Sequence, residues 1–117
     1  FDPAKAFLLV KLMRENGFVL NEVRQGELTL TAPLDNLKER FLDGNIIHNN
    51  SKMFNWYLGN VSLTKRSVNA TYLPTRQSKY RKIDGFAALL DAHTEYLRKN
   101  PALIPQDKKL TTLIKLQ

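Results

Sequence analysis

Residues 83–97 carry the pattern that most constrains how this chain can fold. Apolar side chains recur there at helical spacing, with acidic and small side chains between them. A helix of this kind buries one face and exposes the other, so it needs a second layer to pack against. The stripe predicted to be buried comprises Ile83, Phe86, Ala87, Leu90 and Leu97, and the opposite stripe comprises Asp84, Ala88, Asp91 and Glu95.

Asp84 lies at the start of this predicted helix on its solvent-facing side, and only Ile83 separates it from Arg81 and Lys82. Two interpretations follow. The helix dipole favours an acid in the first turn, so Asp84 could be a plain capping residue. A carboxylate held at a helix start beside cations also suits a metal ligand for phosphodiester cleavage.

The positive charge of the chain is concentrated in its second half. Residues 1–61 contain seven bases and seven acids, whereas residues 62–117 contain eleven bases and four acids, which accounts for the whole net charge of +7. No acid lies between Gly59 and Asp84. This segment could neutralise phosphates, with Tyr72 and Tyr80 stacking on bases, or it could be a solvated basic loop. Its bases are Lys65, Arg66, Arg76, Lys79, Arg81 and Lys82.

Length and composition favour one soluble domain. The chain has 117 residues, of which 43% are hydrophobic, and no apolar run approaches the roughly 20 residues that a membrane helix needs. The absence of cysteine excludes disulfides and thiolate metal sites. Because the chain starts on Phe1 rather than Met, we expect it to belong to a longer protein.

The first part of the chain predicts half of a βαβ unit. Asp2 followed by Pro3 suggests an N-cap and a first helical residue, and the apolar residues of 4–15 predict a helix buried against a sheet or between layers. Residues 18–24 predict a strand. Phe1 and Asp2 would then end a preceding parallel strand, where α/β proteins place their sites.

The middle of the chain predicts short elements. Residues 27–30 suggest an extended piece, and Thr31, Ala32 and Pro33 suggest the start of the next helix. A short helix is expected over 51–58, with Trp56 as a core anchor. Residues 61–64 and 70–73 predict a hairpin whose tip is 65–69. His48, without a second ligand at suitable spacing, is more often a structural residue.

Five stretches, taken in order, resemble the C-terminal end of the large terminase subunit of tailed bacteriophages or prophages. The resemblance runs from about Phe1 to about Leu97, and the order and spacing of the stretches carry it. They are Phe1-Asp2-Pro3, Arg24-Gln25-Gly26, Asn45-Ile46-Ile47-His48-Asn49-Asn50, Trp56-Tyr57-Leu58-Gly59-Asn60-Val61 and Lys82-Ile83-Asp84-Gly85-Phe86-Ala87-Ala88-Leu89.

The resemblance implies an α/β, RNase H-like nuclease fold, of which this chain would be the C-terminal portion, with helices on an incomplete sheet plus a hairpin. Three acids in that family hold two divalent metals, Mg²⁺ or Mn²⁺, that activate a water and stabilise the leaving oxygen. Asp2 matches the second acid and Asp84 the third, whereas the first lies upstream. Cleavage by this chain alone is therefore not expected. His48 and Asp91 are possible accessory residues.

The resemblance also implies a setting. Residues 1–100 would belong to the nuclease domain and residues 101–117 to a basic C-terminal tail. The substrate would be concatemeric double-stranded viral DNA in the cytoplasm of a bacterial host, the partners a small terminase subunit and a portal, and no membrane would be involved. Two alternatives stay open, namely a basic DNA-binding module without chemistry and a protein-docking module.

Overall fold

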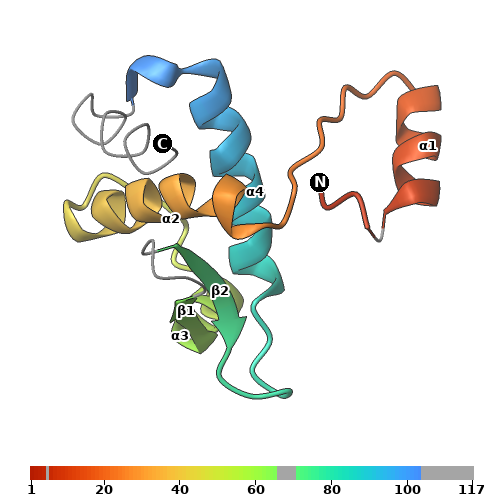
Figure 1. The fold of residues 1–117 in the computed structure, drawn as a ribbon. Coiled ribbons are helices and arrows are strands. Elements are labelled where there is room, and N and C mark those ends of the chain that lie inside the picture. The colour runs from red at the N-terminus through yellow and green to blue at the C-terminus, as the bar shows by residue number, and fades with distance from the viewer. Residues whose placement is uncertain (5, 66–70, 104–117) are drawn as a thin grey trace.

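The computed structural model describes residues 1–4, 6–65 and 71–103, apart from the side chain of Lys65. These residues form four α-helices, one 3-10 turn and one antiparallel pair of strands (Figure 1). The coarse α/β prediction is thereby confirmed. The elements are α1 (Phe7–Glu15), α2 (Glu27–Leu42), α3 (Lys52–Asn60), β1 (Val61–Lys65), β2 (Tyr72–Arg76), α4 (Asp84–Lys99) and η1 (Pro101–Leu103).

Helices α2 and α4 cross each other and enclose the core (Figure 1). The stripe predicted for residues 83–97 is confirmed at Phe86, Leu90 and Leu97, which are buried, while Asp84 and Ala88 are exposed. Burial of these apolar side chains is the main force that holds the two helices together. The core cluster consists of Val23, Leu30, Leu34, Leu37, Phe86 and Leu90.

A buried polar cluster also links α2 to α4. Asn36 Oδ1 accepts a hydrogen bond from Arg40 Nε (2.9 Å) and lies 2.8 Å from His93 Nε2. Because that oxygen can only accept, the Nε2 atom of His93 carries the proton. Burial, and secondarily the positive charge of Arg40, lower the pKa of His93 below its usual 6.5.

Helix α2 begins one turn earlier than predicted. Residues 27–30 are its first turn instead of an extended piece, and Pro33 lies inside the helix. The early start places Leu30 on the same stripe as Leu34 and Leu37, where it is almost completely buried. Burial of a leucine therefore outweighs the preference of proline for a helix start.

The hairpin prediction is confirmed, with the second strand two residues later than expected. Strands β1 and β2 pair antiparallel, with Val61 opposite Arg76 and Lys65 opposite Tyr72. Helix α3 precedes the hairpin and is capped by Ser51 Oγ, which accepts from the Phe54 amide. Trp56, expected as a core anchor, is instead 45% exposed.

The predicted strand over residues 18–24 is not formed as a regular strand, so in the described part of the chain the helices do not pack on a larger sheet. Two backbone hydrogen bonds remain, from the Phe1 amine to Asn21 O (2.9 Å) and from Val23 N to Phe1 O (2.8 Å). They have the pattern of parallel strands. One such pair is too little for a strand, but it brings Phe1 beside residues 21–23 with α1 between them in sequence.

Helix α1 stands apart from α2 and α4 (Figure 1). The sequence predicted that it would be buried against a sheet or between layers, and this prediction is wrong. Only Val10 of its residues is buried, while Phe7 is 81% and Leu8 67% exposed. The sheet that should cover it is reduced, among the described residues, to Phe1 and the segment 18–25.

Candidate active site

Asp84 is the first residue of α4, and its side chain is exposed. Within the described residues it accepts no hydrogen bond and forms no ion pair, so both carboxylate oxygens face solvent. Ile83 precedes it in the N-cap position and provides no side-chain cap. Asp84 is therefore available to a ligand, as a first-turn acid that is not used to cap its own helix.

Helix α3 holds the start of α4 on both sides of Asp84. The side chain of Asn60, the last residue of α3, donates a hydrogen bond from Nδ2 to Lys82 O at 2.8 Å. The ring of Tyr57 lies against Gly85, where a Cβ atom would stand 2.8 Å from Cε2 and 3.1 Å from Cγ of that ring. The sequence reasoning missed these contacts, although both residues lie in the stretch 56–61 that carried the resemblance.

Four of the predicted DNA-binding cations lie between the last residue of β2 and the N-cap of α4, in a segment that we call the basic loop (residues 76–82). A turn forms within it, where the Arg81 amide donates to Ser78 O (3.1 Å). Lys79 Nζ lies 4.9 Å from the ring centre of exposed Tyr80. Tyr72, in contrast, packs against the core. The exposed cations of the basic loop are Arg76, Lys79, Arg81 and Lys82.

The other predicted cations and accessory residues are less informative. Arg66 and the side chain of Lys65 lie outside the described residues. His48 is exposed, and its Nδ1 accepts from the Asn50 amide at 3.0 Å while its ring meets Phe54 edge-on. These contacts give His48 a local structural role. Asp91 Oδ1 accepts from Gln25 Nε2 at 2.9 Å.

Asp2 lies outside any helix, contrary to its predicted N-cap role. Its Oδ1 accepts the Ala4 amide at 2.9 Å, which is a local turn, and α1 starts only at Phe7 after an N-cap at Ala6. The short side chain of Asp accepts from a nearby backbone amide in a turn as well as at a helix start, so the Asp-Pro pair alone does not distinguish the two. One carboxylate oxygen of Asp2 remains without a described partner.

No described contact joins Asp2 to Asp84, and the two acids belong to different segments of the structure. The segment that pairs with Phe1 lies along α4, where Asn21 Nδ2 donates to Glu95 Oε1 (2.7 Å) and Gln25 to Asp91. Asp91 is two helical turns, about 10 Å, beyond Asp84. Across residues 1–4, 6–65 and 71–103, no three His, Cys, Asp or Glu side chains form a group that could hold a metal ion.

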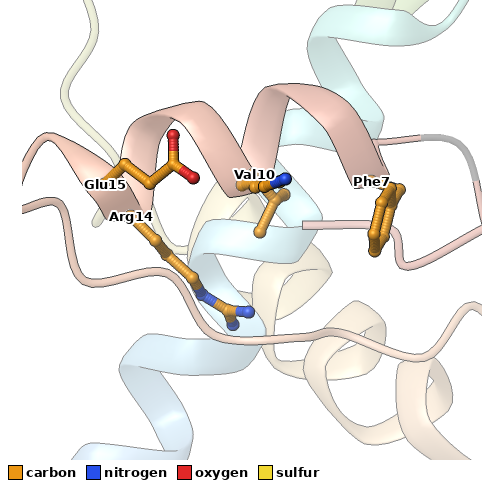
Figure 2. Close-up of a pocket in the computed structure, with 5 residues that line it drawn as sticks. Phe7, Val10, Arg14 and Glu15 are labelled. Atoms are coloured by element: carbon orange, nitrogen blue, oxygen red, sulfur yellow. The ribbon is translucent and has the colours of Figure 1, made fainter.

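A shallow pocket on α1 belongs to a different part of the molecule. Figure 2 shows Phe7, Val10 and Arg14 projecting from one side of α1 and Glu15 from another. Arg14 Nη2 donates to Leu20 O (2.9 Å), and its guanidinium lies 5.6 Å from the Phe1 ring centre. Through Arg14, this face therefore holds α1 to Phe1 and Leu20, and none of its lining residues is Asp2 or Asp84.

Comparison with known proteins decides the family. The family model described as terminase large subunit, endonuclease domain matches residues 1–100. The chain belongs to this family of terminase nuclease domains. No curated protein and no solved structure matches the chain.

Membership of the terminase nuclease family implies a nuclease with DNA as substrate. The two acids discussed above fit such an enzyme in donor type, because exposed carboxylate oxygens are the ligands that Mg²⁺ and Mn²⁺ prefer. The match covers all residues described up to Asn100, including both acids and the basic loop. Within the described ranges, no helix has the length and apolar character that a membrane span requires.

Proposed function

We propose that this chain forms the C-terminal portion of an RNase H-like, metal-dependent endonuclease domain in the large terminase subunit of a tailed bacteriophage or prophage. Its task would be to cut concatemeric double-stranded DNA during packaging. The observation that carries the proposal is an unpaired, exposed acid, Asp84, next to an exposed basic loop, within a chain whose first 100 residues match the terminase nuclease family.

In this proposal Asp84 and Asp2 supply carboxylate ligands for divalent cations, Mg²⁺ or Mn²⁺. Such cations activate a water and stabilise the leaving oxygen in phosphodiester hydrolysis. Asp84 offers two free oxygens, whereas Asp2 offers the one that Ala4 does not use. In this proposal the upstream acid that the resemblance implies completes the metal site with them.

The basic loop would hold the DNA backbone beside Asp84. Lys79, Arg81 and Lys82 are exposed and lie within five residues of the acid, so a phosphate bound by them would lie near the scissile position. Contacts of this type position the duplex without reading its sequence. We therefore expect slight sequence preference. The small terminase subunit, the portal and the host cytoplasm complete the setting that we propose.

The test is Asp84→Asn in a terminase large subunit that contains residues 1–117. We expect metal-dependent cutting of duplex DNA to be abolished, because the amide that replaces the carboxylate has no charge to hold a cation. DNA affinity should stay equal or rise slightly, since a negative charge near the phosphates is removed. Asp43→Asn, which changes an exposed acid after the end of α2, is the matched control and should cut normally. Undiminished cutting by Asp84→Asn would sink the proposal.

A second candidate is a DNA-binding module without chemistry. The exposed cations of the basic loop favour it, because they could bind phosphates whether or not Asp84 holds a metal. This module would bind duplex DNA with a steep dependence on salt, and neither acid would matter for any activity. Cutting that Asp84→Asn abolishes and Asp43→Asn preserves would exclude it. A protein-docking module would instead show weak or salt-insensitive DNA binding.

A further inference from the structure

Asn60 is an unusual residue for the interior of this molecule. It is 1% exposed and one of the most completely buried side chains in the described part of the chain. Its Nδ2 donates to Lys82 O, but its Oδ1 has no hydrogen-bond partner among the described residues. A buried acceptor without a partner costs stability, so an apolar side chain of the same shape would suit the core better. Stability alone does not explain Asn60.

The hydrogen bond from Asn60 fixes the chain two residues before Asp84. Helix α4 has no side-chain cap at its N-terminus, because Ile83 occupies that position. The chain that enters α4 is therefore held by a residue of another helix, through the hydrogen bond to the Lys82 carbonyl. Without that bond, the first turn of α4 would be free to fray, as uncapped helix ends do.

Tyr57 fixes the chain one residue after Asp84. Its ring occupies the space that a side chain at position 85 would fill, and Gly85 is what allows this approach. Tyr57 and Asn60 lie three residues apart and hence on the same face of α3. A single helical turn of α3 thus contacts the backbone on both sides of the exposed acid.

We propose that this turn of α3, through Asn60 and Tyr57, is the positioning element for Asp84. The two residues set the position and direction of the Asp84 carboxylate without touching DNA or metal themselves. The proposal rests on the assignment of Asp84 as a metal ligand and deepens it. Groups that orient metal ligands from behind matter for affinity, and changing them typically costs about 10- to 100-fold in metal affinity or activity.

The principal experiment compares Asn60→Leu with Asn55→Leu in a terminase large subunit that contains residues 1–117. Leucine keeps the approximate shape of Asn60 and removes both the donor and the unpaired acceptor. Asn55 is the matched control because it is an exposed asparagine of the same helix whose side chain bonds to Asn50. The readouts are the melting temperature, amide hydrogen exchange without metal, and the Mn²⁺ concentration that gives half-maximal cutting.

For Asn60→Leu we expect an unchanged or higher melting temperature together with a loosened first turn of α4. Exchange at the Ala87 amide, which donates to Ile83 O, should quicken by about 3- to 10-fold, the equivalent of one hydrogen bond. Exchange in the middle of α4 should not change. The half-maximal Mn²⁺ concentration should rise by about 10-fold or more, and excess Mn²⁺ should restore part of the cutting. Asn55→Leu should match the parent in all three.

A second variant, Asn60→Asp, keeps the test informative if the leucine variant does not fold. A carboxyl group can donate to Lys82 O only when it is protonated, and burial raises the pKa of such a group. The half-maximal Mn²⁺ concentration of the Asn60→Asp variant, divided by that of the parent at the same pH, should therefore decrease as the pH falls from about 8 to about 6. A residue that only fills the core would show no such recovery.

Two results separate failure of this proposal from failure of the proposed function. If Asn60→Leu keeps the parental Mn²⁺ dependence and Ala87 exchange while Asp84→Asn abolishes cutting, the positioning role is wrong and the nuclease assignment stands. If Asp84→Asn cuts normally, the nuclease assignment falls and the positioning role falls with it.

Discussion

Replacing Gly85 by alanine should destabilise the protein, although alanine is the better helix former. The added Cβ would lie 2.8 Å from Tyr57 Cε2, 3.1 Å from Cγ and closer still to Cδ2, and a rigid ring cannot bend away. Crowding of this kind costs about 1–3 kcal/mol. Alanine returns about 0.4–1 kcal/mol by restricting the unfolded chain. The expected net loss is about 1 kcal/mol, or ~4 °C or more in melting temperature.

Urea unfolding followed by circular dichroism and Trp56 fluorescence measures this change, and Gly59→Ala is the control. Gly59 also lies in a helix, but a Cβ there would meet nothing within 4 Å, so alanine should stabilise by about 0.4–1 kcal/mol. The sharper test uses Tyr57→Ala as background. With the ring absent, Gly85→Ala should change sign and stabilise. The same destabilisation in both backgrounds would refute the contact as its cause.

Two further predictions concern the core and the basic loop. The free energy of unfolding should fall as the pH drops below about 6.5, because the histidine takes up a proton at higher pH in the unfolded chain than it does when buried. For one group, this decrease cannot exceed about 1.4 kcal/mol per pH unit. Thermal unfolding of His93→Gln between pH 7.5 and pH 5 should lack this component, and an equal decline in both proteins would contradict it. Replacing Lys79, Arg81 and Lys82 by alanine should weaken duplex DNA binding for every sequence and reduce the salt slope by about 0.9 for each phosphate that the loop no longer neutralises, whereas an unchanged slope would show that the loop does not touch DNA.

Sequence periodicity predicted the elements that bury one clear face. The stripe from Phe86 to Leu97 lies in the core as expected. Where a local preference disagreed with burial in the core, the prediction was wrong. Pro33 suggested a helix start, but only a helix that begins at Glu27 buries Leu30 against the core. Burial against residues distant in sequence decided where this helix begins, and a short stretch of sequence does not contain that information.

The candidate site was predictable only in part. Asp84 could be placed at a helix start and on the exposed side because both properties follow from spacing along a single helix. The contacts that hold it could not, because Asn60 and Lys82 are 22 residues apart and meet through the turn from α3 into the hairpin. The type and place of Asn60 give no such signal either, because the bonds that an asparagine makes by local preference are to neighbouring backbone groups and this one is not local.

For the first 25 residues, the order in which the segments connect was predicted correctly, whereas the burial of helix α1 was not. Residues 4–15 are apolar on several sides, so periodicity could not distinguish a helix between two layers from a helix with exposed leucines, and the burial expected for Leu8 and Leu12 is wrong. The connection was nevertheless right. Phe1 bonds to Asn21 and Val23 in the parallel pattern, and α1 joins the two paired segments as the crossover of a βαβ unit does. This single pair of hydrogen bonds places the two segments side by side in parallel. It does not pair either segment with a further strand. Without that neighbour no sheet exists among the described residues to cover α1, and its apolar face stays exposed.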